Sequence, residues 1–278
     1  MRNDQEIKKA AEAIKNADAI LITAGAGIGV DSGLPDFRGD QGFWKAYPVI
    51  ADMGISFSDM ANPGWFESDP RLAWAFYGHR LNLYRETNPH KGFDLLLKWA
   101  KEKEFGYFVF TSNVDGQFQK AGFDKNSIYE VHGSIHHFQC IKPCSNDIWD
   151  ASDINVDVEL VNFRAYEPLP TCPHCGGLAR PNILMFGDWL WLSNRSSQQN
   201  SIYHDWLGDL NRAKVRFVII EAGAGNAVPT VRMQSNSVYR KYNADFIRIN
   251  PRDYDAPHGA ISIPMGTKDA LEAIESYM

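Results

Sequence analysis

The sequence lacks an excess of positive charge: its 278 residues include 28 Lys and Arg against 34 Asp and Glu, a net charge of −6. We therefore expect no nucleic-acid partner held through bulk positive charge. Long apolar runs are also missing, since the run at 19–22 is far too short to span a bilayer and no export signal is visible. There is no internal repeat, Gly/Ser linker or low-complexity tract. These absences predict a globular, cytoplasmic protein that does not enter a membrane.

Cysteine is scarce, and the four in the chain fall into two close pairs. Three residues separate Cys140 from Cys144, and two residues separate Cys172 from Cys175. In a reducing compartment such pairs bind metal more often than they form disulfides. Four thiolates complete a tetrahedral zinc site with no open position, so we predict a structural zinc ion. Four free thiols are the alternative, because the 27 residues between the pairs exceed the usual ribbon spacing.

The sequence does contain a regular alternation of short apolar runs and amphipathic segments. The apolar runs are typical of strands buried on both faces of a parallel sheet. The amphipathic segments repeat apolar residues at helical spacing. This order predicts an α/β fold, a Rossmann-like parallel sheet with helices on both faces. The predicted strands are 19–23, 106–111, 128–131, 216–221, 245–250 and 260–264, and the predicted helices are 5–16, 70–86, 90–103 and 267–277.

Two stretches interrupt this alternation. Residues 39–70 are rich in aromatics, Met, Gly and Pro, and residues 136–180 carry every cysteine. We interpret them as two insertions that form a smaller helical and zinc-ribbon module. The predicted division assigns 1–38, 86–135 and 186–278 to a discontinuous Rossmann-like NAD-binding domain, and 39–85 and 136–185 to the smaller module.

A glycine-rich turn that begins at Gly25 directly follows the first predicted strand. Glycines in such a turn let the backbone approach a pyrophosphate, whose charge exposed amides then bind. The dinucleotide fingerprint of dehydrogenases needs a glycine at position 30, which is Val30 here. The glycines alone therefore leave two interpretations open, a nucleotide-binding loop and a tight turn without a ligand.

The segment Gly25-Ala-Gly-Ile-Gly-Val-Asp-Ser-Gly-Leu-Pro-Asp-Phe-Arg38 resembles the signature of the sirtuin family, the NAD-dependent protein-lysine deacylases. Further blocks resemble the family in the same order over nearly the whole chain, and chance does not account for six ordered blocks. These blocks are Thr111-Ser-Asn-Val-Asp115, Val131-His-Gly133, the cysteine pairs, the stretch from 180 to Phe186-Gly-Asp188, and Ile249-Asn250.

The resemblance implies NAD-dependent removal of acetyl, succinyl or malonyl groups from the lysines of an acylated protein, with nicotinamide and O-acyl-ADP-ribose as products. It makes His132 the general base that deprotonates a ribose hydroxyl of NAD, and Asn113 the residue that orients the ribose and a water. It makes Asp115 a hydrogen-bonding partner of the nicotinamide amide. The implied NAD-binding residues are Gly25, Ala26, Gly27, Ile28, Asp36, Phe37, Arg38, Ser112, Asn113, Asp115, Gly223, Ala224 and Asn250.

Each of these residue types also has an ordinary structural use. A lone histidine is more often structural than catalytic, and Asn113 and Asp115 follow a strand where such residues cap a helix. Phe37 is equally compatible with a core position and Arg38 with a solvated charge. The histidines His136 and His137, which follow the third predicted strand, are expected on the surface of the small module.

Substrate contacts are implied at two further places. Tyr77 and Arg80 share one face of a predicted helix at i and i+3, and the pair resembles that of the sirtuin subclass that removes succinyl and malonyl groups. An arginine there can bind a carboxylate through two hydrogen bonds. An ordinary amphipathic surface is the alternative. Phe186 and Gly187 resemble the loop on which substrate backbone adds as a strand.

The chain departs from the family pattern within the implied NAD site. Gly29 replaces a serine, Ala24 a threonine and Ser112 a glutamine, and Ala222-Gly-Ala-Gly225 replaces a Gly-Thr-Ser turn. These changes shorten or remove side-chain hydrogen bonds and leave backbone contacts possible, so NAD binding is still expected, with a changed affinity and a changed partition of the reaction. They motivate an alternative enzyme, an NAD hydrolase or ADP-ribosyltransferase. A module that senses NAD without turning it over is a third hypothesis, against which His132 counts.

Overall fold

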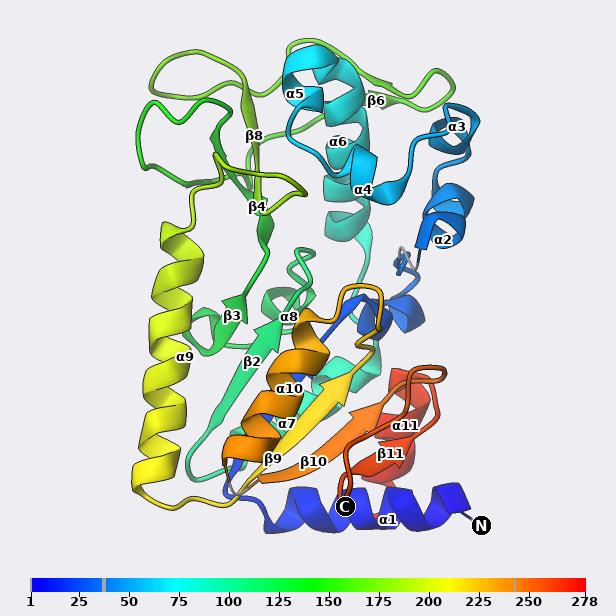
Figure 1. The fold of residues 1–278 in the computed structure, drawn as a ribbon, viewed down its shortest axis with the longest axis vertical. Helices are drawn as coiled ribbons and strands as arrows, with labels where there is room; N and C mark the ends of the chain where they lie inside the picture. The colour runs from blue at the N-terminus through cyan, green and yellow to red at the C-terminus, as the bar shows by residue number, and fades with distance from the viewer. Residues whose placement is uncertain (1, 37–38, 243) are drawn as a thin grey trace.

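A computed structural model describes residues 2–36, 39–242 and 244–278 of the chain. Within these ranges, six parallel strands form one sheet, and a smaller module lies beyond one end of it (Figure 1). The strand order is β11-β10-β9-β1-β2-β3, so the predicted Rossmann-like sheet is confirmed. The strands are β1 (Ala19–Ala24), β2 (Tyr107–Thr111), β3 (Ile128–Glu130), β9 (Phe217–Ala222), β10 (Ala244–Ile249) and β11 (Ile261–Ile263).

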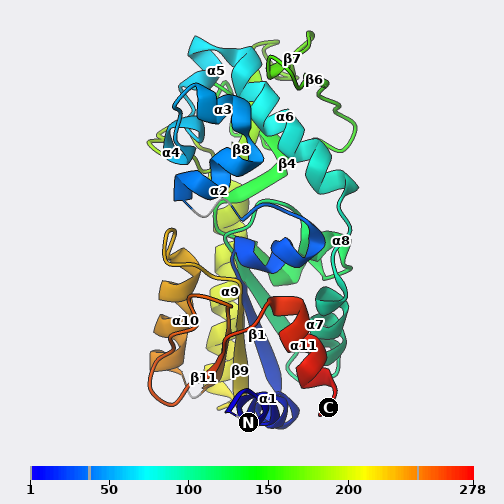
Figure 2. The same cartoon turned by 90° about the vertical axis from the view of Figure 1, so that its right-hand side faces the viewer.

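Helices cover both faces of this sheet because successive strand residues point to opposite sides. Ile20 and Ile22 of β1 pack with α1 (Arg2–Asn16), α7 (Lys91–Lys101) and α11 (Thr267–Glu275). Leu21 packs on the other face with α9 (Asn194–Arg212) and α10 (Thr230–Lys241). Figure 2 shows α10 on one side of the sheet and α7 with α11 on the other.

The sequence analysis did not predict α9 and α10. Their buried positions include polar side chains, Ser196 in α9 and both Arg232 and Ser235 in α10. An apolar period of 3.6 residues is therefore weak in both segments, although each packs firmly on the sheet.

The chain order reverses within the sheet between β1 and β9. The carboxyl ends of these two neighbouring strands meet at one edge, and the crevice outside such a reversal is where open α/β sheets bind ligands. The turns that begin at Gly25 and Gly223 follow these two strands directly.

The smaller module is built around the long helix α6 (Pro70–Glu86) and a three-stranded antiparallel sheet of order β5-β4-β8. Trp74 of α6 donates its indole N–H to the carbonyl of Ala179, at 3.1 Å, and joins helix to sheet. The remaining elements of the module are β4 (Gly133–Cys140), β5 (Trp149–Asp150), β8 (Ala179–Ile183), the hairpin β6 (Val158–Glu159) and β7 (Arg164–Ala165), and the short helices α2 (Gly39–Ala46), α3 (Pro48–Asp52), α4 (Phe57–Met60) and α5 (Trp65–Ser68).

Three short helical turns complete the elements, namely η1 (Ala26–Ser32), α8 (Gln117–Lys120) and η2 (Lys125–Ser127). None of the helices in the described ranges combines the length and the apolar character that crossing a bilayer requires.

Candidate functional site

A cavity of about 560 Å³ lies where the carboxyl edge of the large sheet faces the small module. The sheet contributes the turns after β1, β2 and β9, and the module contributes α6 and the segment that follows β8. Its walls are mostly apolar, with a few polar groups that converge on the same space, as is usual for a small-molecule site.

Two glycine turns form the floor of this cavity. A Cβ on Gly25 would lie 2.9 Å from the Cα of Ala224, and a Cβ on Gly223 would lie 2.1 Å from the backbone nitrogen of Ile28. Gly223 also has a φ of +63°, a conformation that side chains disfavour. The two turns therefore pack backbone against backbone, and the floor of the cavity presents main chain rather than side chains.

The turn after β2 places Asn113 and Asp115 on the cavity wall. Asn113 donates its side-chain N–H to the carbonyl of Gly25 at 3.2 Å, which ties this turn to the first glycine turn. The Asp115 carboxylate accepts the backbone N–H of Gln117 at 2.9 Å. Burial raises the pKa of Asp115 to about 6 despite this hydrogen bond.

His132 lies between β3 and β4 and lines the same cavity. Burial lowers the pKa of His132, and a hydrogen bond to the backbone of Ser112 acts in the opposite direction. The imidazole is therefore neutral near pH 7, the state that a general base requires.

Three side chains of α6 form the polar end of the cavity: Tyr77, Arg80 and Tyr84. The Arg80 guanidinium donates from Nε and Nη2 to the hydroxyl of Tyr84, at 3.1 and 2.9 Å. The Tyr77 hydroxyl is buried and has no hydrogen-bond partner among the described residues. A buried, unpaired hydroxyl next to a buried cation marks a place where a polar ligand group fits.

Phe186 and Gly187 lie on the rim of the cavity. Their loop is held by a buried ion pair in which Arg180 donates to Asp188 at 2.7 Å. The backbone N–H of Phe186 donates to the carbonyl of Ala61, so the loop is also tied to the segment after α4. The rim is thus a fixed edge rather than a loose loop.

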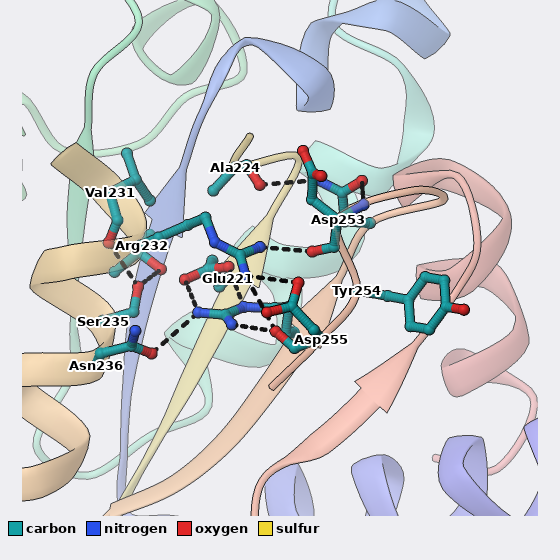
Figure 3. Close-up of polar contacts among 12 residues, drawn as sticks. Glu221, Ala224, Val231, Arg232, Ser235, Asn236, Asp253, Tyr254 and Asp255 are labelled. Atoms are coloured by element: carbon teal, nitrogen blue, oxygen red, sulfur yellow. Dashed lines mark hydrogen bonds and ion pairs between the residues drawn. The ribbon is translucent and has the colours of Figure 1, made fainter. Parts of the chain in front are cut away.

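Polar contacts beyond the second glycine turn brace that end of the sheet (Figure 3). Asn250 donates to the carbonyl of Ala224 at 2.8 Å and accepts the backbone N–H of Asp253 at 3.0 Å. Arg232 of α10 donates to the carbonyl of Asp253 and to the Asp255 carboxylate. Asn250 is completely buried in this arrangement and is not part of the cavity lining.

The cavity brings most of the predicted site residues together. Like Asn250, Ile28 does not line the cavity, because its side chain is buried in the core on the α1 side of the sheet. Phe37 and Arg38 lie outside the described residues. The predicted residues that line the cavity are Gly25, Ala26, Gly27, Asp36, Tyr77, Arg80, Ser112, Asn113, Asp115, His132, Phe186, Gly187, Gly223 and Ala224.

Sequence reasoning missed several lining residues, of which Tyr84 matters most because it binds Arg80. Its place at i+4 from Arg80 on one helix face was a usable signal. The apolar lining residues Leu34, Phe57 and Val231 gave no comparable signal, because a buried apolar residue looks the same in a core and in a cavity wall.

The four cysteines come together away from this cavity, in the small module. Their sulfur atoms all lie within 4.8 Å of one another, with Cys140 and Cys175 at 3.7 Å and Cys144 and Cys172 at 3.6 Å. A tetrahedral zinc site with Zn–S bonds of about 2.3 Å needs sulfur atoms about 3.8 Å apart. Both the donor set and its dimensions therefore fit the predicted structural zinc.

Comparison with known proteins shows what this arrangement is similar to. A family model described as the Sir2 family matches residues 25–217. An NAD-dependent protein deacylase of Candida albicans is 30% identical over 228 residues, covering 68% of this chain and 72% of the relative. An NAD-dependent protein deacylase of Aeropyrum pernix is 27% identical over 249 residues, covering 89% of this chain and 86% of the relative.

The fold has solved counterparts as well. A structure described as a Sir2 homolog–NAD complex superposes with a TM-score of 0.67 at 22% identity, covering 97% of this chain and 93% of that chain. At this identity the likeness establishes the shared fold.

Proposed function

The chain belongs to the Sir2 family, and we propose that it removes acyl groups from protein lysines with NAD as co-substrate. The products are nicotinamide, O-acyl-ADP-ribose and the free lysine. The observation that carries this proposal is the cavity at the strand-order reversal, where two glycine turns, Asn113, Asp115 and His132 converge.

The two glycine turns would hold the pyrophosphate of NAD. Gly25 and Gly223 leave the backbone open to the cavity, and added Cβ atoms would collide with the facing turn. Contact through the backbone would also let NAD bind although Ser112 has a shorter side chain than the family's glutamine and Ala224 has no side-chain donor. When bound, NAD supplies the ADP-ribosyl group that accepts the acyl group as nicotinamide departs.

Asn113 and Asp115 would orient the nicotinamide end. The hydrogen bond from Asn113 to Gly25 fixes the turn after β2 against the first glycine turn. The groups that would bind the two ends of NAD therefore keep a fixed relative position. Asp115 is buried at the inner wall, where a carboxyl group can bind the nicotinamide amide. Holding the reacting groups in one geometry is the main contribution that this site makes to the rate.

His132 would take the proton from a ribose hydroxyl. Its contact with the Ser112 backbone holds the ring, and burial keeps the ring neutral at pH 7. A positioned general base of this kind contributes about 10²–10⁴-fold to a rate.

The acyl group would lie against Tyr77 and Arg80. The buried Arg80 guanidinium and the unpaired Tyr77 hydroxyl can both donate hydrogen bonds to a terminal carboxylate. We therefore propose succinyl and malonyl groups as the preferred acyl groups. Phe186 and Gly187 would hold the substrate backbone at the rim.

Cys140, Cys144, Cys172 and Cys175 would hold zinc as a structural ion, since four thiolates leave no position for substrate. A thiolate set of this kind fits a reducing compartment, and we propose the cytoplasm as the location. The negative net charge fits an acylated protein as partner rather than a nucleic acid.

The proposal is tested by incubating the purified protein with NAD and matched acetyl-, malonyl- and succinyl-lysine peptides. Mass spectrometry follows the peptide, and chromatography follows nicotinamide. We expect a peptide mass loss equal to the acyl group, and no such loss in His132→Ala. Nicotinamide release with an unchanged peptide contradicts deacylation and supports NAD hydrolysis instead. A wild type without any turnover supports the sensing module.

A further inference from the structure

Strand β4 leads from His132 into the small module and runs beside the turn that carries Asp115. Two hydrogen bonds join strand and turn. The backbone N–H of Ile135 donates to the carbonyl of Val114 at 3.0 Å, and Nε2 of His136 lies 2.9 Å from the carbonyl oxygen of Asp115. Because a carbonyl oxygen only accepts, Nε2 of His136 carries the hydrogen in this contact.

The shape of the turn matches the His136 ring. Gly116 has a φ of +70°, and a Cβ added there would lie 2.7 Å from Cδ2 and 2.8 Å from Nε2 of His136. The ring therefore packs directly against the Gly116 backbone and supports the turn by contact as well as by its hydrogen bond. The sequence analysis expected His136 on the surface of the module, whereas the structure shows it half-buried beneath this turn.

The turn lies between two cavities, and hydrogen bonds from Asn113 to Gly25 and from Gln117 to the carbonyl of Tyr84 also hold it. Asp115 and Tyr84 line both the first cavity and a second one of about 670 Å³, and His136 and Gly116 line the second. The carbonyl of Asp115 faces the second cavity, where His136 is its hydrogen-bond partner. Within the part of the chain that the structure describes, His136 is the side chain of the small module that hydrogen-bonds to the turn backbone.

We propose that His136 is a positioning residue that holds Asp115 in place for nicotinamide, and so links the zinc-binding strand β4 to the NAD site. The inference rests on the proposed function, because it assumes that Asp115 contacts nicotinamide. His136 itself touches neither NAD nor the acyl group; it acts through the Asp115 backbone.

The test compares His136→Leu with His136→Gln, whose amide nitrogen takes the place of Nε2. His137→Leu is the matched control, since His137 is the next residue of β4 and makes no contact with the Asp115 backbone among the described hydrogen bonds. Calorimetry gives the Kd of NAD without peptide, and kinetics give the nicotinamide inhibition constant and the KM of the acyl peptide.

In His136→Leu we expect the Kd of NAD and the nicotinamide inhibition constant to rise about tenfold, as loss of one well-placed hydrogen bond predicts. The peptide KM should change less than about twofold, because the acyl end is bound by other residues. His136→Gln should recover most of the loss, and His137→Leu should resemble the wild type. Where His136→Leu does not fold, His136→Asn replaces it, since its shorter amide cannot reach the Asp115 carbonyl.

The inference is overturned if His136→Leu leaves both nicotinamide-dependent constants within twofold of the wild type, or if the peptide KM rises in parallel with them. A glutamine variant as impaired as the leucine variant overturns it too. Because the Kd of NAD is measured without peptide, that part of the test is independent of deacylation. A wild type that binds NAD but leaves peptides intact refutes the proposed function alone.

Discussion

Arg80 is the buried cation on which the proposed preference for acidic acyl groups rests. Its guanidinium is enclosed by α6 and lies over the rings of Phe76, Tyr77 and Tyr84, at 5.1 to 5.8 Å from their centroids. Aromatic faces stabilise a cation that has been removed from water. The charge is thus retained at a buried end of the cavity, where we propose that it favours an acidic acyl group over a neutral one.

We expect Arg80→Met to lower kcat/KM for a succinyl peptide by about 10- to 100-fold, the loss of a charged hydrogen bond worth about 1.5–3 kcal/mol. Deacetylation should fall by less than about threefold. Steady-state kinetics on matched peptides measure both values. Arg71→Met is the control, because Arg71 lies on the same helix but outside the cavity lining. An equal loss on both peptides would remove the carboxylate-binding role.

Protonation of His132 should determine how kcat/KM falls on the acid side of the pH profile. A general base must be neutral, and burial lowers the pKa of His132 from 6.5. Activity should therefore fall as the pH decreases through a midpoint below 6.5, and stay level from there to pH 8. The profile of kcat/KM between pH 5 and 8 measures this midpoint. A midpoint clearly above 6.5 contradicts a buried, neutral base.

Asp115 titrates in the same range, since its pKa is raised to about 6. The variant Asp115→Asn separates the two groups. If His132 causes the acid limb, the limb persists in the residual activity of this variant. Its disappearance would assign the limb to Asp115 instead.

At the residue scale, sequence reasoning located the polar residues of the site because they follow predicted strands and match family motifs. Asn113, Asp115 and His132 all line the cavity. Sequence reasoning did not identify His136, because its proposed role depends on strand β4 of the small module lying beside the Asp115 turn. No local pattern in the sequence carries that long-range contact.

At the scale of elements, β4 connects the two parts of the molecule. It starts one residue after His132 and ends at Cys140. The zinc site and the candidate base are therefore at opposite ends of one strand. We expect an ion bound at Cys140 to limit the movement of β4 and so to support the position of the residues near His132.

We expect one zinc per chain, and loss of that zinc in Cys172→Ser. Since a loss of about 2 kcal/mol lowers the melting temperature of a chain this size by about 5 °C, we expect a decrease of at least that size. Elemental analysis and thermal unfolding measure the two effects. His174→Ala is the control, because His174 lies between two cysteines but binds Asp147 rather than the sulfur cluster. Zinc-free wild-type protein with unchanged melting would contradict a structural metal.

The elements of the sheet were predictable from sequence, whereas two of its covering helices were not. All six predicted strands are present, because buried parallel strands form unbroken apolar runs. Helices α9 and α10 escaped prediction, since tertiary packing rather than an apolar stripe stabilises them. Strands β5, β6 and β7 of the small module are two residues long and leave no sequence pattern, so the cysteines were the clearest sequence signal of the module.

At the scale of the whole molecule, buried histidines make stability depend on pH. Burial lowers the pKa of five of them, and that of His137 to about 4. The other four are His79, His90, His132 and His136. Below pH 6.5 the unfolded chain takes up protons that the folded chain resists, so the free energy of unfolding falls as the pH decreases.

Between pH 7.5 and 5, His137 alone should lower the free energy of unfolding by about 2 kcal/mol, from the difference between 6.5 and about 4. Asp115 acts in the opposite direction, since its raised pKa stabilises the folded state as the pH falls through about 6. Urea unfolding at the two pH values measures the net decrease. His137→Leu should reduce the pH dependence. Equal stability at both pH values contradicts this account.

In the whole molecule, the carboxyl edge of the large sheet faces the small module, and the cavity of about 560 Å³ lies between them. The central claim is that this cavity couples the cleavage of NAD to the removal of an acyl group. The most direct test is the molar ratio of nicotinamide released to lysine freed, measured in one reaction of the wild type with NAD and a succinyl-lysine peptide. The account predicts a ratio of about one, because each acyl group leaves on one ADP-ribose. Nicotinamide formed without free lysine would contradict it.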